Sequence, residues 1–297
     1  MAGLLFLCAT LFNMTFRETI EKFKQEGRAI GHFNFSDSNQ LCAIAEAARE
    51  QSLPVIAGLS EGEREFFPLS HARALVDVYR SQGVEVFLNA DHTYSVEKVQ
   101  RAISAGVDSV VVDGATLNLE DNIQMMTTCI KYARASGRDV VMEGELGYIG
   151  TSSKLLDTLP EGVTLENLTT VDNAMRFVEE TGADCFAPAV GNIHGMLKNA
   201  KEPKLHPDRV KEIADAVKIP LVLHGASGNT AEEVVACIKA GIAIVHINTE
   251  FRVAYRDALK KSLAENPEEV APYKFLAPVA ATMKEFISQK IRLFAGI

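Results

Sequence analysis

The sequence lacks tryptophan, closely spaced cysteine pairs, an excess of basic residues and any long hydrophobic run. Its 297 residues include 30 lysines and arginines against 39 aspartates and glutamates, which gives a formal net charge of −9. A protein that mainly binds a nucleic-acid backbone needs a basic surface, so this acidic balance argues against that class. It does not argue against the binding of a small anion, which one local site can achieve.

Cysteine usage indicates a reducing compartment, and we expect the protein in the cytoplasm. Five cysteines occur, and none belongs to a C-x-x-C pair: Cys8, Cys42, Cys129, Cys185 and Cys237. The odd count and the wide spacing argue against a disulfide scaffold and against a cysteine-rich zinc site.

The hydrophobic run 4–12 is the one segment that resembles a targeting signal. It has no basic segment before it and no clear cleavage site after it. It is also much shorter than the roughly 20 residues that span a bilayer, so we expect no membrane association. We interpret residues 1–13 as a leader that is disordered or results from an incorrect start, with Met14 as a plausible first residue.

Short hydrophobic β-rich runs alternate with amphipathic helical segments along the chain. Most of the runs are continuous, as in parallel strands that are buried on both faces. The eight runs lie at 30–35, 54–59, 86–90, 108–113, 140–145, 184–190, 219–223 and 243–247. Helices are predicted over 95–105 and 230–240, because a capping residue (Ser95, Thr230) opens each segment and a glycine follows it.

Eight β-then-α units in about 250 residues predict a single-domain (β/α)8 (TIM) barrel over residues 14–297. An open, doubly wound α/β sheet is the alternative at this point. The connection over 146–170 is much longer than the others and rich in turn-forming residues. We expect a lid or binding loop there, with a purely structural insertion as the alternative.

Four histidines follow or end predicted strands, where (β/α)8 enzymes carry their active sites. They are His92, His194, His224 and His246. A single histidine in such a place is more often structural, but several that converge on one rim favour a metal site. Three neutral imidazoles with one open position suit catalytic Zn²⁺, which acts as a Lewis acid.

Carboxylates and glycine-containing turns lie at the same predicted rim. Asp91 directly precedes His92 and is a candidate for proton transfer, and Glu145 is a candidate fourth metal ligand or a partner of one. The stretch 225–228 opens a helix, where backbone N–H groups and the helix dipole attract anions. The turn at Asn248 and Thr249 offers the same environment. These turns predict a phosphate site, although such turns also occur only to close a connection.

These residues resemble the class II, zinc-dependent fructose-bisphosphate and tagatose-bisphosphate aldolases. The resemblance extends from about Thr15 to the C-terminus. It rests on seven blocks in the family's order: GHFNFSD (31–37), SEG (60–62), ADHT (90–93), EGELG (143–147), GNIHG (191–195), LVLHGASG (221–228) and INTE (247–250). Each block is weak alone, but together and in this order they are a strong signal.

The resemblance implies a role for each matching residue. It implies zinc ligands at His92, His194 and His224, with Glu145 near the metal, and a proton-transfer aspartate at Asp91. The dihydroxyacetone-phosphate end of the substrate would contact Gly195, Gly225, Ala226, Ser227, Asn248 and Thr249. The other end of the substrate would contact Ser60.

Three positions depart from the family pattern. Asn89 replaces a histidine, Ser153 replaces the mobile-loop glutamate that acts on the C–H proton of dihydroxyacetone phosphate, and His246 replaces the asparagine that binds the enediolate. We interpret His246 as a second catalytic residue, because a histidine that titrates near neutrality can transfer protons. A carboxylate outside the motifs could serve instead. The loss of the glutamate also fits a slow or re-purposed enzyme.

The resemblance implies a lyase of carbohydrate metabolism and glycolysis. It would cleave fructose 1,6-bisphosphate reversibly to dihydroxyacetone phosphate and glyceraldehyde 3-phosphate through a zinc-bound enediolate. The alternatives are an aldolase for another phosphorylated keto-sugar such as tagatose 1,6-bisphosphate, a zinc-dependent isomerase, and a non-catalytic zinc- or phosphate-binding barrel. Another divalent ion could replace zinc, and a monovalent cation could assist the phosphate site.

The resemblance also implies a homodimer or a larger homo-oligomer. The sequence itself offers only an apolar C-terminal helix over 283–294. That helix could pack on its own barrel or on a second subunit.

Overall fold

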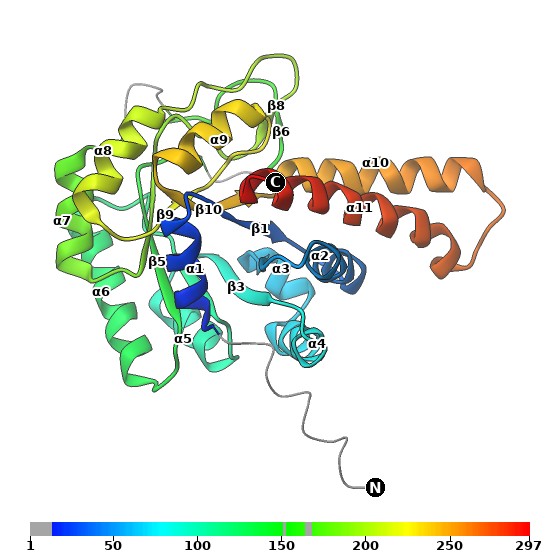
Figure 1. Cartoon of the computed structure of the whole chain (residues 1–297), viewed down its shortest axis with the longest axis horizontal. Helices are drawn as coiled ribbons and strands as arrows, with labels where there is room; N and C mark the ends of the chain where they lie inside the picture. The colour runs from blue at the N-terminus through cyan, green and yellow to red at the C-terminus, as the bar shows by residue number, and fades with distance from the viewer. Residues whose placement is uncertain (1–13, 151–152, 164–167) are drawn as a thin grey trace, which may run out of the picture.

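The computed structural model describes residues 14–150, 153–163 and 168–297, so the predicted leader 1–13 lies outside the described residues. The hydrophobic runs form one closed parallel barrel (Figure 1). In sequence order its strands are β1 (Ile30–Asn34), β2 (Val55–Leu59), β3 (Val86–Thr93), β4 (Ser109–Val112), β5 (Val141–Leu146), β7 (Cys185–Pro188), β9 (Leu221–Leu223) and β10 (Ile242–Ile247). The first strand, β1, pairs with both β2 and β10, which confirms the (β/α)8 barrel and excludes the open sheet.

Helices cover the outside of the barrel. They are α1 (Phe16–Gln25), α2 (Ser38–Gln51), α3 (Glu61–Phe66), α4 (Leu69–Ser81), α5 (Val96–Ser104), α6 (Leu119–Ala135), α7 (Val171–Thr181), α8 (Pro207–Val217), α9 (Ala231–Ala240), α10 (Thr249–Glu265) and α11 (Pro272–Ala295). The side chains of Ser95 and Thr230 cap α5 and α9, so both helices predicted from these capping residues are confirmed.

The interior of the barrel is apolar at one end and polar at the other. Alternate residues of a strand face the same side, so each strand contributes an inward series with a period of two. The first inward residues form a buried apolar layer with α1, whose Phe16 ring stacks on Phe87 at 4.4 Å between centroids. This layer contains Ile30, Ile56, Phe87, Val141, Val222 and Ile244. The polar residues that follow therefore lie toward the carboxyl ends of the strands.

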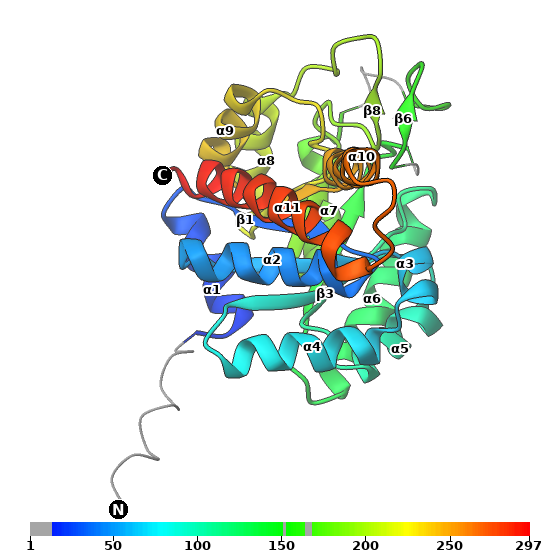
Figure 2. The same ribbon diagram turned by 90° about the vertical axis from the view of Figure 1, so that its right-hand side faces the viewer.

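Helices α10 and α11 run side by side and project beyond the barrel (Figures 1 and 2). Helix α11 packs on α2 as well, and its Ile287 and Ile291 are buried. The predicted C-terminal helix is thus part of α11, and it packs within its own chain. In the described part of the chain, no helix combines the length and the hydrophobicity needed to cross a membrane.

The long connection predicted after β5 is present and ends where α7 begins. Within its described residues, β6 (Leu155–Leu156) pairs in parallel with β8 (Met196–Leu197), which belongs to the connection after β7. The two long connections therefore support one another at the carboxyl end of the barrel. That this segment moves as a lid stays a prediction.

Candidate active site

Three imidazoles and one carboxylate converge at the carboxyl ends of β3, β5 and β9 and in the loop after β7. The residues are His92, Glu145, His194 and His224, and one ligand atom of each lies within 4.8 Å of the others. The ring centroid of His92 is 4.7 Å from that of His194 and 4.9 Å from that of His224. Side chains that are separated by as many as 132 positions in the sequence thus form one cluster.

Buried carboxylates orient two of the imidazoles. Asp113 Oδ2 lies 2.8 Å from Nδ1 of His92, and Glu143 Oε1 lies 2.6 Å from Nε2 of His224. The remaining nitrogens, Nε2 of His92 and Nδ1 of His224, face each other at 3.3 Å. A carboxylate behind an imidazole is the usual arrangement around a metal-binding histidine, because it fixes the ring and its tautomer.

Two further buried atoms of the cluster lack a hydrogen-bond partner among the described residues. They are Nε2 of His194 and Oε2 of Glu145. A buried polar atom without a partner costs free energy, so such atoms indicate a missing ion or ligand. Nitrogen donors with one carboxylate suit a divalent ion such as Zn²⁺, so the residues present fit the metal.

The electrostatics of the cluster favour metal-binding forms. Burial, together with charge on His92, lowers the pKa of His224 to about 3. Burial alone would lower the pKa of His92, but Asp91, Asp113 and Glu145 hold it well above its usual value. Because metals bind the neutral imidazole, metal binding must displace the proton from His92.

Asp91, His246 and His32 form a second buried group beside the first. The His246 ring stacks on His32 at 3.6 Å and on His224 at 4.1 Å between centroids. Its Nδ1 lies 3.5 Å from Oδ1 of Asp91. Burial alone would raise the pKa of Asp91, but His92 and His246 hold it well below its usual value. Asp91 is therefore an ionised carboxylate that can accept a proton.

Two adjoining cavities give access to this group. The inner cavity is lined by Asn34, Asp91, His92, Ser153, His194, Gly195, His224, Gly225, Ser227, His246, Asn248 and Thr249. The outer cavity, of about 200 Å³, is lined by Ser60, Glu61, Gly62, Asp91, His92, Tyr94, Ser153, His194, Asn248 and Arg252. Of the predicted substrate-binding residues only Ala226 lines neither cavity. Ala226 is buried as a whole residue and lies behind the residues that line the inner cavity.

The other two positions that depart from the family pattern have polar partners. Asn89 lies between His32 and Ser109, with distances of 3.1 Å to His32 Nε2 and 2.7 Å to Ser109 Oγ. Ser153 Oγ accepts a hydrogen bond of 3.3 Å from Nδ2 of Asn248. The long connection after β5 therefore contacts the turn before α10 directly over the inner cavity.

Sequence reasoning missed several residues that shape this site. Asp113 directly follows β4, and Glu143 precedes Glu145 by two positions, so the strand period could have identified both. Asn34 lies at the end of β1, inside a block that carried the resemblance. Arg252 lies in the first turn of α10 and had no comparable signal.

The model of the family described as class-II fructose-bisphosphate aldolase matches residues 14–296 of this chain. The chain belongs to the class II fructose-bisphosphate aldolase family. It is therefore an aldolase, a lyase, in a family that depends on a metal, and the four clustered ligands could hold that metal.

Relatives and solved structures agree with this assignment. The fructose-bisphosphate aldolase of Geobacillus stearothermophilus is 32% identical over 289 residues, which cover 95% of this chain and 97% of that protein. The 6-phospho-5-dehydro-2-deoxy-D-gluconate aldolase of Bacillus licheniformis is 34% identical over 287 residues and 95% of each chain. The crystal structure of the YdjI aldolase of Escherichia coli K12 covers 95% of this class II aldolase and 96% of its own chain, with a TM-score of 0.78 and 28% identity.

Proposed function

We propose that this class II aldolase cleaves fructose 1,6-bisphosphate reversibly to dihydroxyacetone phosphate and glyceraldehyde 3-phosphate, with Zn²⁺ as its metal. The observation that carries the proposal is the cluster of His92, His194, His224 and Glu145 next to an ionised Asp91. The similarity to a relative named fructose-bisphosphate aldolase supports this substrate.

The metal and its ligands have separate tasks. A bound Zn²⁺ would supply Lewis acidity toward the substrate carbonyl and stabilise the negative charge that develops when the C3–C4 bond breaks. His92, His194 and His224 would hold the ion, with Glu145 within reach as a further ligand. Asp113 and Glu143 keep His92 and His224 in the correct orientation through their hydrogen bonds.

Asp91 accepts the proton of the C4 hydroxyl group. Its Oδ2 accepts a hydrogen bond of 2.8 Å from Nδ2 of Asn34, whereas its Oδ1 has no hydrogen-bond partner among the described residues and only the longer ion-pair contact of 3.5 Å with His246. One oxygen is thus anchored and the other is available to the substrate. As the proton leaves, the C4 oxygen becomes the aldehyde of the leaving triose, and the C3–C4 electron pair stays on the dihydroxyacetone-phosphate part.

His246 returns a proton to that carbon. Burial, together with charge on His224, lowers the pKa of His246 to about 4, so it does not titrate near neutrality as the sequence suggested; it stays the stronger base beside Asp91, whose pKa is held well below its usual value. It takes the place of the loop glutamate, since Ser153 cannot serve as a base of comparable strength. Its Nδ1 is 3.5 Å from Oδ1 of Asp91, so the proton removed from the C4 hydroxyl can pass from Asp91 to His246 and then to carbon. The reaction therefore needs no net proton from solvent.

We place one phosphate at each of the two cavities; the inner cavity has a volume of only about 20 Å³, so it must widen to admit a phosphate. Gly195, Gly225, Ala226 and Ser227 lie at one wall of the inner cavity or directly behind it. Asn248 and Thr249 at the start of α10 line the same cavity, and the backbone N–H of Glu250 donates a hydrogen bond of 3.3 Å to Oγ of Ser227, so the positive end of this helix lies beside the glycine-containing turn. The far phosphate lies in the outer cavity beside Ser60 and Arg252.

A substrate panel tests this assignment. With Zn²⁺ present, we expect kcat/KM for fructose 1,6-bisphosphate to exceed that for tagatose 1,6-bisphosphate at least about tenfold, a difference of about 1.4 kcal/mol in transition-state binding. Coupled detection of triose phosphate gives both rates. Because one relative is named for 6-phospho-5-dehydro-2-deoxy-D-gluconate, that compound belongs in the panel. Preference for it or for tagatose 1,6-bisphosphate would identify the alternative aldolase, and interconversion without triose products would identify an isomerase.

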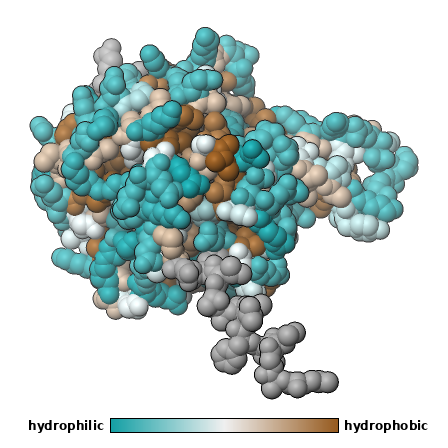
Figure 3. All heavy atoms as spheres, viewed as in Figure 1, coloured by the Kyte–Doolittle hydropathy of each residue, from teal (hydrophilic) through white to brown (hydrophobic). Residues whose placement is uncertain are grey.

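We also infer that the protein forms a homodimer or a larger homo-oligomer in the cytoplasm. The support lies at the tip of the arm made by α10 and α11, where Val270 is 86% and Tyr273 74% exposed. Figure 3 shows how far this arm stands out from the rest of the surface, so a partner could cover these apolar groups. Light scattering on the purified protein is expected to give at least twice the chain mass of 32.4 kDa. A particle of one chain mass at micromolar concentration would contradict this.

A further inference from the structure

The backbone of His92 is in an unfavourable conformation. Its φ angle is 34°, in the left-handed region that residues with a Cβ atom rarely adopt. The pairing of β3 with β4 shifts register between Ala90 and Thr93, so Asp91 and His92 lie on an irregular part of the strand. Such a segment keeps its conformation only when its surroundings hold it.

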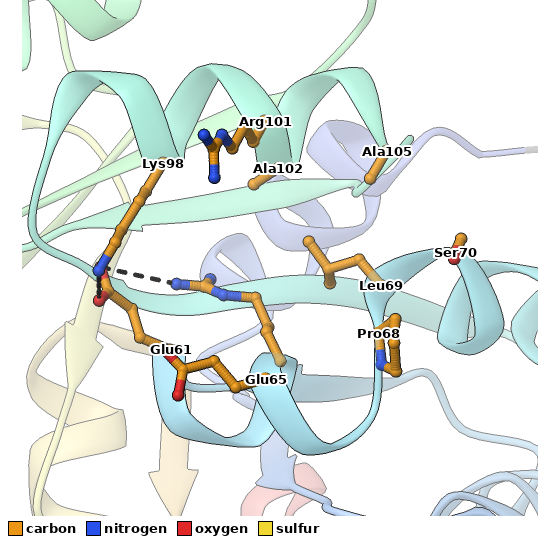
Figure 4. Close-up of a pocket in the computed structure, with 10 residues that line it drawn as sticks. Glu61, Glu65, Pro68, Leu69, Ser70, Lys98, Arg101, Ala102 and Ala105 are labelled. Carbon is orange, nitrogen blue, oxygen red and sulfur yellow. Dashed lines mark hydrogen bonds and ion pairs between the residues drawn. The ribbon is translucent and has the colours of Figure 1, made fainter.

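Helix α3 holds both residues that follow His92. Nη1 of Arg64 donates a hydrogen bond of 3.1 Å to Oγ1 of Thr93, which is fully buried. The backbone N–H of Tyr94 donates to Oε1 of Glu61 at 3.0 Å. Figure 4 shows Glu61 directed at Lys98 of α5, with which it forms an ion pair. The end of β3 is therefore tied to α3 at Thr93 and at Tyr94.

Helix α3 is itself anchored to the interior of the barrel. Its Glu63 is buried and accepts a hydrogen bond of 2.9 Å from Nδ2 of Asn34 and one of 2.7 Å from the backbone N–H of Ser60. The same amide nitrogen of Asn34 donates to Asp91. Because α3 is fixed in this way, its hydrogen bonds can hold the end of β3 in one position.

We propose that Arg64 is a positioning residue that keeps Asp91 and His92 in their reactive arrangement through its hydrogen bond to Thr93. The part that concerns turnover rests on the proposed function. In the part of the chain that the structure describes, Arg64 lines a separate cavity of about 390 Å³ between α3, α4 and α5, and neither of the two cavities at the histidines. It therefore acts on the strand and not on the substrate.

The Arg64→Met variant removes the donor and keeps the aliphatic stem. We expect it to lower zinc affinity and kcat about tenfold each. This is the lower end of the 10–100-fold loss that is typical when a residue supporting the metal ligands is replaced. KM should change less than about threefold. Zinc affinity is measured by competition with a chromogenic chelator, and kcat and KM by triose-phosphate release. The matched control is Arg101→Met, which removes an exposed arginine from the same 390 Å³ cavity that Arg64 lines. It is expected to change none of these quantities by more than about twofold.

The Thr93→Val variant separates the hydrogen bond from the charge of the guanidinium, which the Asp91 carboxylate also attracts. Valine keeps the shape and removes the acceptor, together with the long hydrogen bond of 3.4 Å that the hydroxyl donates to the Ala90 carbonyl, so this variant should lose zinc affinity as Arg64→Met does. The loss in the double variant should be smaller than the sum of the two single losses, since both changes remove the hydrogen bond between Arg64 and Thr93. If Arg64→Met does not fold, as judged by circular dichroism, Thr93→Val alone decides.

Unchanged zinc affinity in Thr93→Val would overturn the proposal, as would additive losses in the double variant. The chelator measurement uses no substrate, so its result stands even if none of the sugar phosphates is cleaved. Failure of the proposed function and failure of this inference are therefore distinguishable.

Discussion

EDTA is expected to abolish the aldol cleavage activity of this protein, and added Zn²⁺ is expected to restore it. The ligand atoms of His92, Glu145, His194 and His224 are buried and converge, and two of them have no hydrogen-bond partner among the described residues. Without a cation, no group in this cluster can stabilise charge on the substrate carbonyl as a Lewis acid does. Cleavage of fructose 1,6-bisphosphate by the untreated, chelated and reconstituted protein measures the effect.

The His194→Ala variant tests the same metal requirement at a single ligand. It removes one ligand, so we expect less than one zinc ion per chain by elemental analysis and activity about a thousandfold lower or below detection, a loss of about 4 kcal/mol in transition-state stabilisation. His71→Ala is the matched control, because His71 is an exposed histidine in the first turn of α4. Full activity in protein shown to contain no metal would contradict the prediction.

The barrel could be predicted because its strands are nearly continuous hydrophobic runs. The predicted ends of the strands were less accurate where polar site residues interrupt the hydrophobic pattern. The run 86–90 stops before two polar residues, yet β3 continues through Asp91 and His92 to Thr93. The continuation depends on contacts with β4 and α3, which lie far away in the sequence. A pattern of single residues contains no information on such contacts.

The histidine cluster could be predicted for a related reason. Carboxyl ends of parallel strands meet at one rim, so residues that follow the strands come together whatever their register. The stack of His32 on His246 depends on register as well. These two residues are direct partners in the pairing of β1 with β10, the first and last strands of the barrel. Only the closed barrel defines that pairing, so the sequence pattern did not single out His32 as a site residue.

Loss of the His246 imidazole is expected to lower turnover about 10²–10⁴-fold, the range that general acid–base groups contribute. The ring is nearly buried and lies between His32 and His224, with Nδ1 3.5 Å from Asp91. Ser153, the residue at the family's glutamate position, offers only a hydroxyl group. The His246→Ala variant should therefore fail at proton transfer to carbon while it retains zinc.

Hydrogen exchange separates proton transfer from cleavage of the carbon–carbon bond. Incubation of dihydroxyacetone phosphate with the protein in D₂O, followed by NMR, measures exchange at carbon alone. We expect His246→Ala to lose exchange in proportion to turnover, and His246→Asn, which restores the family residue, to remain equally slow. Adding Ser153→Glu to His246→Asn restores both family residues and should recover a measurable part of the exchange. Unchanged exchange in His246→Ala would contradict the prediction and assign the proton transfer to another group. Asp91 would then be the first residue to replace, because its Oδ1 forms an ion pair with His246 Nδ1 at 3.5 Å.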